Sequence, residues 1–250
     1  MPDLVLVRHG QSDWNAENLF TGWVDRGLTD RGRAEAQKAG RLLAEIGDLD
    51  LAVVHTSVLT RAVQTANILL DELGKSYLPV RRNWRLNERH YGALQGLNKK
   101  ETAELHGPDQ VKLWRRSYSV RPPALDRADP THPSFDPRYK GVPAAELPSG
   151  ECLEDVVARM VPYWVDRVAP DLYAVGSGGV LVVAHGNSIR ALRKHLEGIS
   201  DDDIVDLDVP TGVPHRYRLA DDLSIIGRGE DIGDAEEISA AAEEVRRQAG

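Results

Sequence analysis

Two short segments, far apart in the chain, share one design. Residues 4–12 read LVLVRHGQS and residues 180–188 read VLVVAHGNS. Each is an apolar run that ends in His-Gly, one polar residue and Ser. A run that is apolar at successive positions is typical of a strand covered by helices on both faces. The repeat therefore predicts two buried parallel strands that end in the same chemistry.

The surrounding sequence alternates between strand and helix patterns. Strands are predicted for residues 3–8, 51–57 and 179–185, and helices near 29–47, 58–73, 150–169 and 188–199. Ser57 is expected to cap the second helix, and Gly47 and Gly74 to end the first two. Such alternation indicates right-handed crossovers. We expect an α/β fold with three layers, in which helices flank a mostly parallel central sheet.

Two segments fall outside this rhythm. Residues 84–147 are rich in proline and show no sustained period, so we expect a long mixed insertion over the active-site edge of the sheet. Residues 228–250 hold three basic and seven acidic side chains. We expect a single domain over residues 1–227, followed by an acidic, weakly anchored helical tail over 228–250.

The charge of the chain is unevenly spread. A net charge of −8 over 250 residues argues against nucleic-acid binding. Residues 81–127 nevertheless hold eleven Lys or Arg against five Asp or Glu. This basic middle favours a pocket for a small anion, although a solvated basic face remains open.

Nothing in the sequence predicts export or a membrane span. The apolar run that begins at Leu4 is short and lacks a preceding basic segment, and no stretch approaches eighteen apolar residues. Cys152 is the single cysteine, which fits a reducing cytoplasm. A catalytic thiol is the alternative to a packing role for Cys152, and its place at the start of an amphipathic helix favours packing.

The two His-Gly turns predict a phosphate site. Ligands bind beyond the carboxyl ends of parallel strands, so His9 and His185 should approach each other there, with Gly186 allowing close contact by backbone amides. Arg8 and Arg61 would repel a divalent metal and attract a dianion, so no metal is expected. The same arginines should keep His9 uncharged and able to attack phosphorus.

The motifs as a whole resemble the histidine phosphatase superfamily, and within it the 2,3-bisphosphoglycerate-dependent phosphoglycerate mutases. The resemblance rests on LVRHGQSDWNAENLFTGW, HTSVLTRAVQT, LNERHYGALQGLNKKETAE, WRRSY, AHGNSIRAL and DVPTGVPHRY. It implies interconversion of 3-phosphoglycerate and 2-phosphoglycerate through a phosphohistidine. It also implies that 2,3-bisphosphoglycerate primes the enzyme, and that the protein is a homodimer or homotetramer.

The resemblance also implies residue roles. His9 matches the nucleophile and Glu88 the acid/base residue, while Arg8, Asn15, Arg61 and His185 match the cradle of the transferring phosphoryl group. The positions that match the grip on the rest of the substrate are Ser12, Thr21, Gly22, Tyr91, Lys99, Arg115, Arg116 and Asn187. Gln11 departs from the Glu that many members have there, and we expect it to alter local charge without loss of activity.

Two rival functions stay open. A phosphohydrolase could use the same His9 chemistry, with water as the acceptor. The insertion favours the mutase because it offers chain to cover the pocket and cations for a second anionic group. A phosphate-binding protein without catalysis is disfavoured, because His9, Glu88 and His185 are all present.

Overall fold

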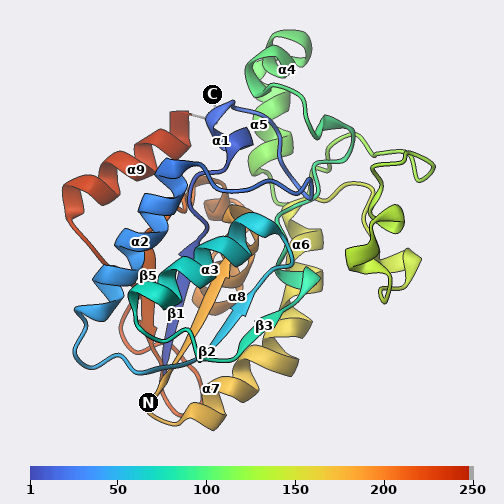
Figure 1. Ribbon diagram of the computed structural model, residues 1–250. Coiled ribbons are helices and arrows are strands. Elements are labelled where there is room, and N and C mark those ends of the chain that lie inside the picture. The colour runs from blue at the N-terminus through green and yellow to red at the C-terminus, as the bar shows by residue number, and fades with distance from the viewer. Residues whose placement is uncertain (248–250) are drawn as a thin grey trace.

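The protein is built on one mixed sheet. A computed structural model describes residues 1–247, and its sheet has the strand order β3-β2-β4-β1-β5-β6 (Figure 1). The strands are β1 (Asp3–Arg8), β2 (Leu51–Thr56), β3 (Val80–Arg82), β4 (Gly179–Ala184), β5 (Pro214–Arg218) and β6 (Glu230–Asp231). Strands β1 to β4 run parallel to one another, whereas β5 pairs antiparallel with β1 and with β6. The predicted mostly parallel sheet is confirmed.

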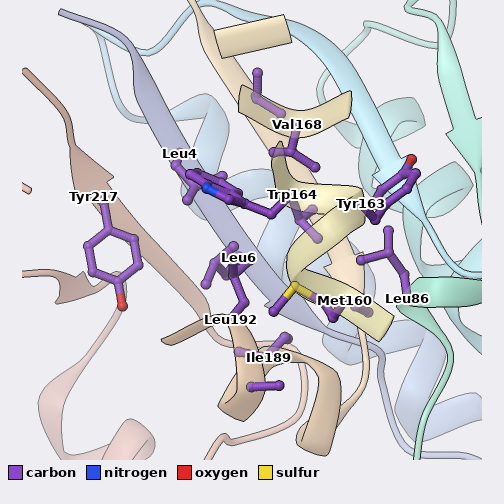
Figure 2. Close-up of a cluster of buried hydrophobic side chains, with 14 of the residues drawn as sticks. Leu4, Leu6, Leu86, Met160, Tyr163, Trp164, Val168, Ile189, Leu192 and Tyr217 are labelled. Carbon is purple, nitrogen blue, oxygen red and sulfur yellow. The ribbon is translucent and has the colours of Figure 1, made fainter. Parts of the chain in front are cut away.

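Helices cover both faces, as the apolar strands predict. Helices α2 (Asp30–Ala44) and α3 (Thr60–Glu72) pack on one face, and α6 (Leu153–Tyr163), α7 (Ala169–Val175) and α8 (Gly186–Glu197) on the other. Strand β1 sends Val5 and Val7 to the first face and Leu4 and Leu6 to the second. Figure 2 shows Leu4 and Leu6 against Trp164 in the second cluster. Each such side chain contributes about 1.5–3 kcal/mol by burial, which fixes the strand that ends in Arg8.

Helix α3 begins later than expected. Its N-cap is Leu59, which provides no side-chain cap, and the helix starts at Thr60. Asp25 instead accepts hydrogen bonds from the Thr60 backbone N–H and hydroxyl, both at 2.7 Å. The prediction that Ser57 caps this helix is therefore wrong. The Ser57 hydroxyl instead accepts from the backbone N–H of Leu59, before the helix, at 3.2 Å and lies 2.7 Å from His185 Nε2.

The segment 84–147 consists of short helices joined by loops. Helices α4 (Lys99–His106) and α5 (Pro108–Arg116) lie above the sheet in Figure 1, and α1 (Asp13–Ala16) lies near them. The 3-10 turns are η1 (Trp84–Leu86), η2 (Gly92–Leu94), η3 (Pro133–Phe135), η4 (Pro137–Tyr139) and η5 (Ala144–Glu146). Phe20, Leu94, Val111 and Trp114 form a small separate core here. This core joins the insertion to the loop that follows α1.

After α6, the π-helix η6 (Trp164–Val168) leads into α7; the 3-10 turn η7 (Asp203–Asp206) follows α8, and the described chain ends in helix α9 (Ala235–Arg247). Figure 1 shows α9 alongside α2. Arg31 pairs with Glu244 at 2.5 Å, and Arg246 with Asp208 at 2.9 Å. A helix thus forms in the predicted tail, of which residues 248–250 lie outside the described part. Among the helices of residues 1–247, none combines the length and the hydropathy of a membrane span.

Candidate active site

The carboxyl ends of β1 and β4 bring the two His-Gly turns together. Arg8 is in register with Ala184, and the His9 backbone N–H donates to the Ala184 carbonyl at 3.0 Å. The rings of His9 and His185 consequently lie edge to face, with 4.8 Å between their centroids. The expected approach of the two histidines is confirmed.

His9 is held as a neutral imidazole with a lone pair on Nε2. Its Nδ1–H donates to the Gly10 carbonyl at 2.7 Å, and Arg61 Nε donates to His9 Nε2 at 3.2 Å. Arginine has no acceptor, so Nε2 must be unprotonated. Burial, then Arg61, then Arg8 lower the pKa of His9 well below 6.5. This nitrogen can therefore attack an electrophile at neutral pH.

Arg61 is fixed by the loop that follows α1. Its two terminal nitrogens donate to the carbonyls of Gly22 at 2.7 Å and Val24 at 3.1 Å. Burial lowers the pKa of Arg61 to about 10, which leaves it charged at neutral pH. A fixed cation beside Nε2 can stabilise a phosphoryl group without moving.

The turn after His9 requires glycine. A Cβ atom on Gly10 would lie 2.1 Å from the Gly32 carbonyl oxygen at the start of α2. The Gly10 backbone N–H donates to the Thr65 hydroxyl at 3.2 Å. Close contact between the turn and two helices thus determines where the His9 ring stands.

His185 is the N-cap residue of α8. Its backbone N–H donates to the Ser188 hydroxyl at 3.0 Å, and its Nε2 shares a hydrogen bond with Ser57. Burial, followed by Arg61 and His9, lowers the pKa of His185 well below 6.5. A neutral ring with one nitrogen bound to a hydroxyl is available as a hydrogen-bonding partner beside His9.

Glu88 enters the site from the loop after η1. Its Oε1 accepts from the backbone N–H groups of Arg89 at 2.7 Å and Asn187 at 3.1 Å. Its carbonyl accepts from Arg159 at 2.9 Å, and Arg159 forms a buried ion pair with Glu151 at 2.6 Å. These contacts fix the backbone and the Oε1 atom of Glu88. Its other carboxylate oxygen, Oε2, consequently lies near Gly186.

His9, Arg61 and Glu88 line a strongly cationic cavity of about 90 Å³, which has room for several waters at about 10–15 Å³ each. Among the described residues, its charged lining comprises one acid, Glu88, and six basic side chains, which are Arg8, Arg61, Lys99, Arg115, Arg116 and Arg190. The predicted residues Asn15, Thr21, Gly22, Tyr91, Gly186 and Asn187 also line it. Such a cavity attracts a small polyanion and repels a divalent metal ion.

The insertion supplies three of the cations. Burial, then Arg115 and Arg8, lower the pKa of Lys99 to about 7, and burial lowers the pKa of Arg115 to about 10. Arg116 pairs with Asp208 at 2.5 Å. The basic middle of the sequence therefore contributes to a pocket, as well as to the exposed surface.

Ser12 does not line the cavity. It caps α1, and its hydroxyl donates to Asn15 Oδ1 at 2.9 Å, so the amide nitrogen of Asn15 is left for a ligand. The side-chain oxygen of Gln11 accepts from the Thr29 hydroxyl at 2.9 Å. Ser12 thus acts on the cavity through Asn15, while Gln11 is bonded to the residue that caps α2.

Comparison with known proteins decides the family. The sequence profile of the histidine phosphatase superfamily (branch 1) matches residues 4–131 and 125–222. The chain belongs to the histidine phosphatase superfamily. It is 52% identical over 248 residues to a 2,3-bisphosphoglycerate-dependent phosphoglycerate mutase of Borreliella afzelii (strain PKo), covering 99% of this chain and 98% of the relative. A protein of the same name from Borreliella burgdorferi (strain ZS7) matches to the same extent.

Solved structures of this superfamily include phosphatases. A mycobacterial glucosyl-3-phosphoglycerate phosphatase, in complexes with VO3, superposes with a TM-score of 0.69 at 26% identity, covering 92% of this chain and 97% of that chain. A protein named mycobacterial hydrolase 2 gives 0.66 at 26% identity, covering 98% and 97%. The fold is thus shared with hydrolases as well as with mutases.

Within residues 1–247, sequence reasoning missed five residues that line the cavity, namely Leu19, Arg190, Leu207, Val209 and Val245. Arg190 could have been found, because it lies three positions after Asn187 in a predicted helix and so shares its face. The tail residue Val245 carries no such signal, since only the packing of α9 brings it to the cavity. His185 was predicted and contacts His9, although it is buried behind the lining.

Proposed function

We propose that the protein is a phosphoglycerate mutase that interconverts 3-phosphoglycerate and 2-phosphoglycerate through phosphorylated His9. The observation that carries the proposal is the unprotonated Nε2 of His9 facing Arg61, inside a cavity that the described residues line with six basic side chains and Glu88. The names of the relatives that share 52% identity support the same reaction. Free 2,3-bisphosphoglycerate primes the enzyme by giving one phosphoryl group to His9.

The reaction divides into two transfers. The free hydroxyl of 3-phosphoglycerate attacks the phosphorus on His9, Glu88 takes the hydroxyl proton, and the N–P bond breaks. The resulting 2,3-bisphosphoglycerate reorients, and His9 Nε2 attacks its other phosphoryl group. The P–O bond breaks and Glu88 returns the proton to the leaving oxygen. Phosphohistidine and free substrate hydroxyl are thereby both restored.

The arginines and His185 stabilise the phosphoryl group in transit. As the family resemblance implies, we assign Arg8, Arg61, Asn15 and His185 to the phosphoryl group on His9 Nε2, where charge accumulates on the equatorial oxygens. The 3.2 Å hydrogen bond from Arg61 Nε to His9 Nε2 supports this assignment. Each preorganised donor typically contributes about 10²–10³ in rate. The rest of the substrate, a carboxylate and a second phosphate, is bound by the groups farther out: Thr21, Gly22, Tyr91, Lys99, Arg115, Arg116, Gly186 and Asn187, with Ser12 fixing Asn15.

A phosphatase is the second candidate, because solved relatives of the same fold carry that name. The two reactions differ in what reaches the phosphohistidine, since a mutase must exclude water. Helices α4 and α5 contribute Lys99, Arg115 and Arg116 to the cavity, and α9 contributes Val245. This cover and the surplus of cations favour retention of the bisphosphorylated intermediate.

Turnover of 3-phosphoglycerate separates the candidates. We expect 2-phosphoglycerate as the main product, faster initial turnover when 2,3-bisphosphoglycerate is added, and no activity in His9→Ala. Predominant release of inorganic phosphate would contradict the mutase and favour the phosphatase. Binding of 3-phosphoglycerate with neither product would favour a non-catalytic binding protein.

We also propose a domain division, an assembly and a compartment for this protein. Residues 1–227 form one domain that includes the insertion 84–147, and the acidic tail 228–250 follows it. We further propose a homodimer or homotetramer in the cytoplasm, acting on small phosphorylated molecules. The family resemblance supports the assembly, and the single cysteine, Cys152, supports a reducing compartment.

A further inference from the structure

Arg190 is a buried cation that the proposed reaction does not use. It lies on α8, one turn after Asn187, and only 3% of it is exposed. Its NH1 donates to Asn187 Oδ1 at 2.9 Å, and its NH2 donates to the carbonyls of Ile204 at 2.6 Å and Arg116 at 3.2 Å. Burial, then Arg89 and Arg116, lower its pKa to about 9, so it stays charged at neutral pH. Both terminal nitrogens of Arg190 are therefore committed to protein oxygens.

This contact determines which way the Asn187 amide faces. Arginine offers only donors, so the amide oxygen must face Arg190 and the amide nitrogen must face the opposite side. That nitrogen lies 3.3 Å from the Tyr91 hydroxyl, to which it donates. With the amide reversed, an oxygen would face Tyr91 and the cavity, where it would repel an anionic ligand.

The Tyr91 hydroxyl is in turn left with its proton directed at the cavity. Its oxygen accepts from Asn187 and from Arg89 NH2 at 3.4 Å, and Tyr91 lines the cavity. An oxygen that accepts two hydrogen bonds donates its own proton elsewhere. Burial alone would raise the pKa of Tyr91, but Arg89 and Arg115 hold it below its ordinary value, which strengthens the phenol as a donor.

We propose that Arg190 is a positioning residue for substrate affinity. Through the Asn187 amide, it directs the Tyr91 O–H to the anionic group of the substrate that is not the transferred phosphoryl group. The inference rests on the proposed function for the identity of that substrate. Arg190 acts through its neighbours, so its effect depends on the Tyr91 hydroxyl.

A double-mutant cycle tests this dependence. The affinity for 3-phosphoglycerate is measured by calorimetry on wild type, Arg190→Gln, Tyr91→Phe and the double variant, while isomerisation by wild type is assayed in parallel. We expect Arg190→Gln to weaken affinity about tenfold in the wild-type background, and less than about threefold in the Tyr91→Phe background. The matched control is Arg193→Gln, which removes another α8 arginine, paired with Glu197, and should leave affinity unchanged.

The affinity losses in the two backgrounds and the wild-type isomerisation distinguish the possible outcomes. Equal losses in both backgrounds would mean that Arg190 acts on its own or only on the fold, and would overturn the proposal while normal wild-type isomerisation upholds the function. If wild type binds 3-phosphoglycerate without isomerising it, the proposed function fails, and the affinity cycle still tests Arg190. Melting temperatures identify unfolded variants. Should Arg190→Gln not fold, Arg190→Lys replaces it, because lysine keeps the charge but lacks the fork that holds both Asn187 and Ile204.

Discussion

Substrate binding should draw a proton onto Lys99. Burial, with Arg115 and Arg8 nearby, lowers the pKa of Lys99 to about 7, so the empty site holds it mostly neutral at pH 8. A bound phosphate or carboxylate favours the ammonium form and raises this pKa towards its ordinary value. If the shift is complete, binding at pH 8 takes up about 0.9 proton, the fraction of Lys99 that was neutral.

Proton uptake on binding makes the affinity for substrate depend on pH. The complex holds more protons than the free protein above pH 7, so affinity falls as pH rises through that range. Protonation of the substrate phosphate contributes little, because its second pKa of about 6 leaves only about 1% protonated at pH 8. Other groups whose pKa shifts on binding would add to the measured proton uptake. The contribution of Lys99 is therefore the difference in uptake between wild type and Lys99→Met.

Calorimetry in two buffers with different ionisation enthalpies measures this uptake. We expect about 0.9 proton for wild type at pH 8 and a large decrease in Lys99→Met. The matched control is Lys100→Met, which alters the exposed neighbour on α4 and should keep the wild-type value. Equal uptake in wild type and Lys99→Met would refute the reasoning.

Three further predictions concern single residues. Glu88→Gln removes the proposed proton carrier, so kcat for isomerisation should fall by about 10²–10⁴; a change below tenfold would contradict that role. Gly10→Ala places a Cβ 2.1 Å from the Gly32 carbonyl oxygen, and calorimetry should show a loss of about 1–3 kcal/mol of stability. Arg159→Met leaves Glu151 buried and unpaired; its free energy of unfolding in urea should fall by about 3–5 kcal/mol, and an unchanged value would deny the ion pair a structural role.

The sequence predicts the parts of the fold that local pattern controls. The apolar runs that precede Arg8 and His185 predict β1 and β4 because a strand buried on both faces has no polar alternation. Their shared ending also predicts that the two histidines meet. Helix α2 follows from its spacing of apolar residues, with Thr29 as its cap.

What the sequence does not predict depends on contacts between distant segments. Asp25, 35 residues before Thr60, accepts from the first backbone N–H of α3, and Ser57 bonds with His185 from a distant strand end. The antiparallel placement of β5 beside β1 has no local signal. Val245 reaches the cavity because α9 packs next to α2, where Arg31 pairs with Glu244.

Direct labelling tests whether His9 carries the phosphoryl group. The protein is incubated with radiolabelled 2,3-bisphosphoglycerate, and the label is located by peptide mapping before and after acid treatment. We predict label on His9 alone, lost in acid as expected for a phosphohistidine, and absent from His9→Ala. Acid-stable label on another residue, or no label on folded wild-type protein, would contradict the account.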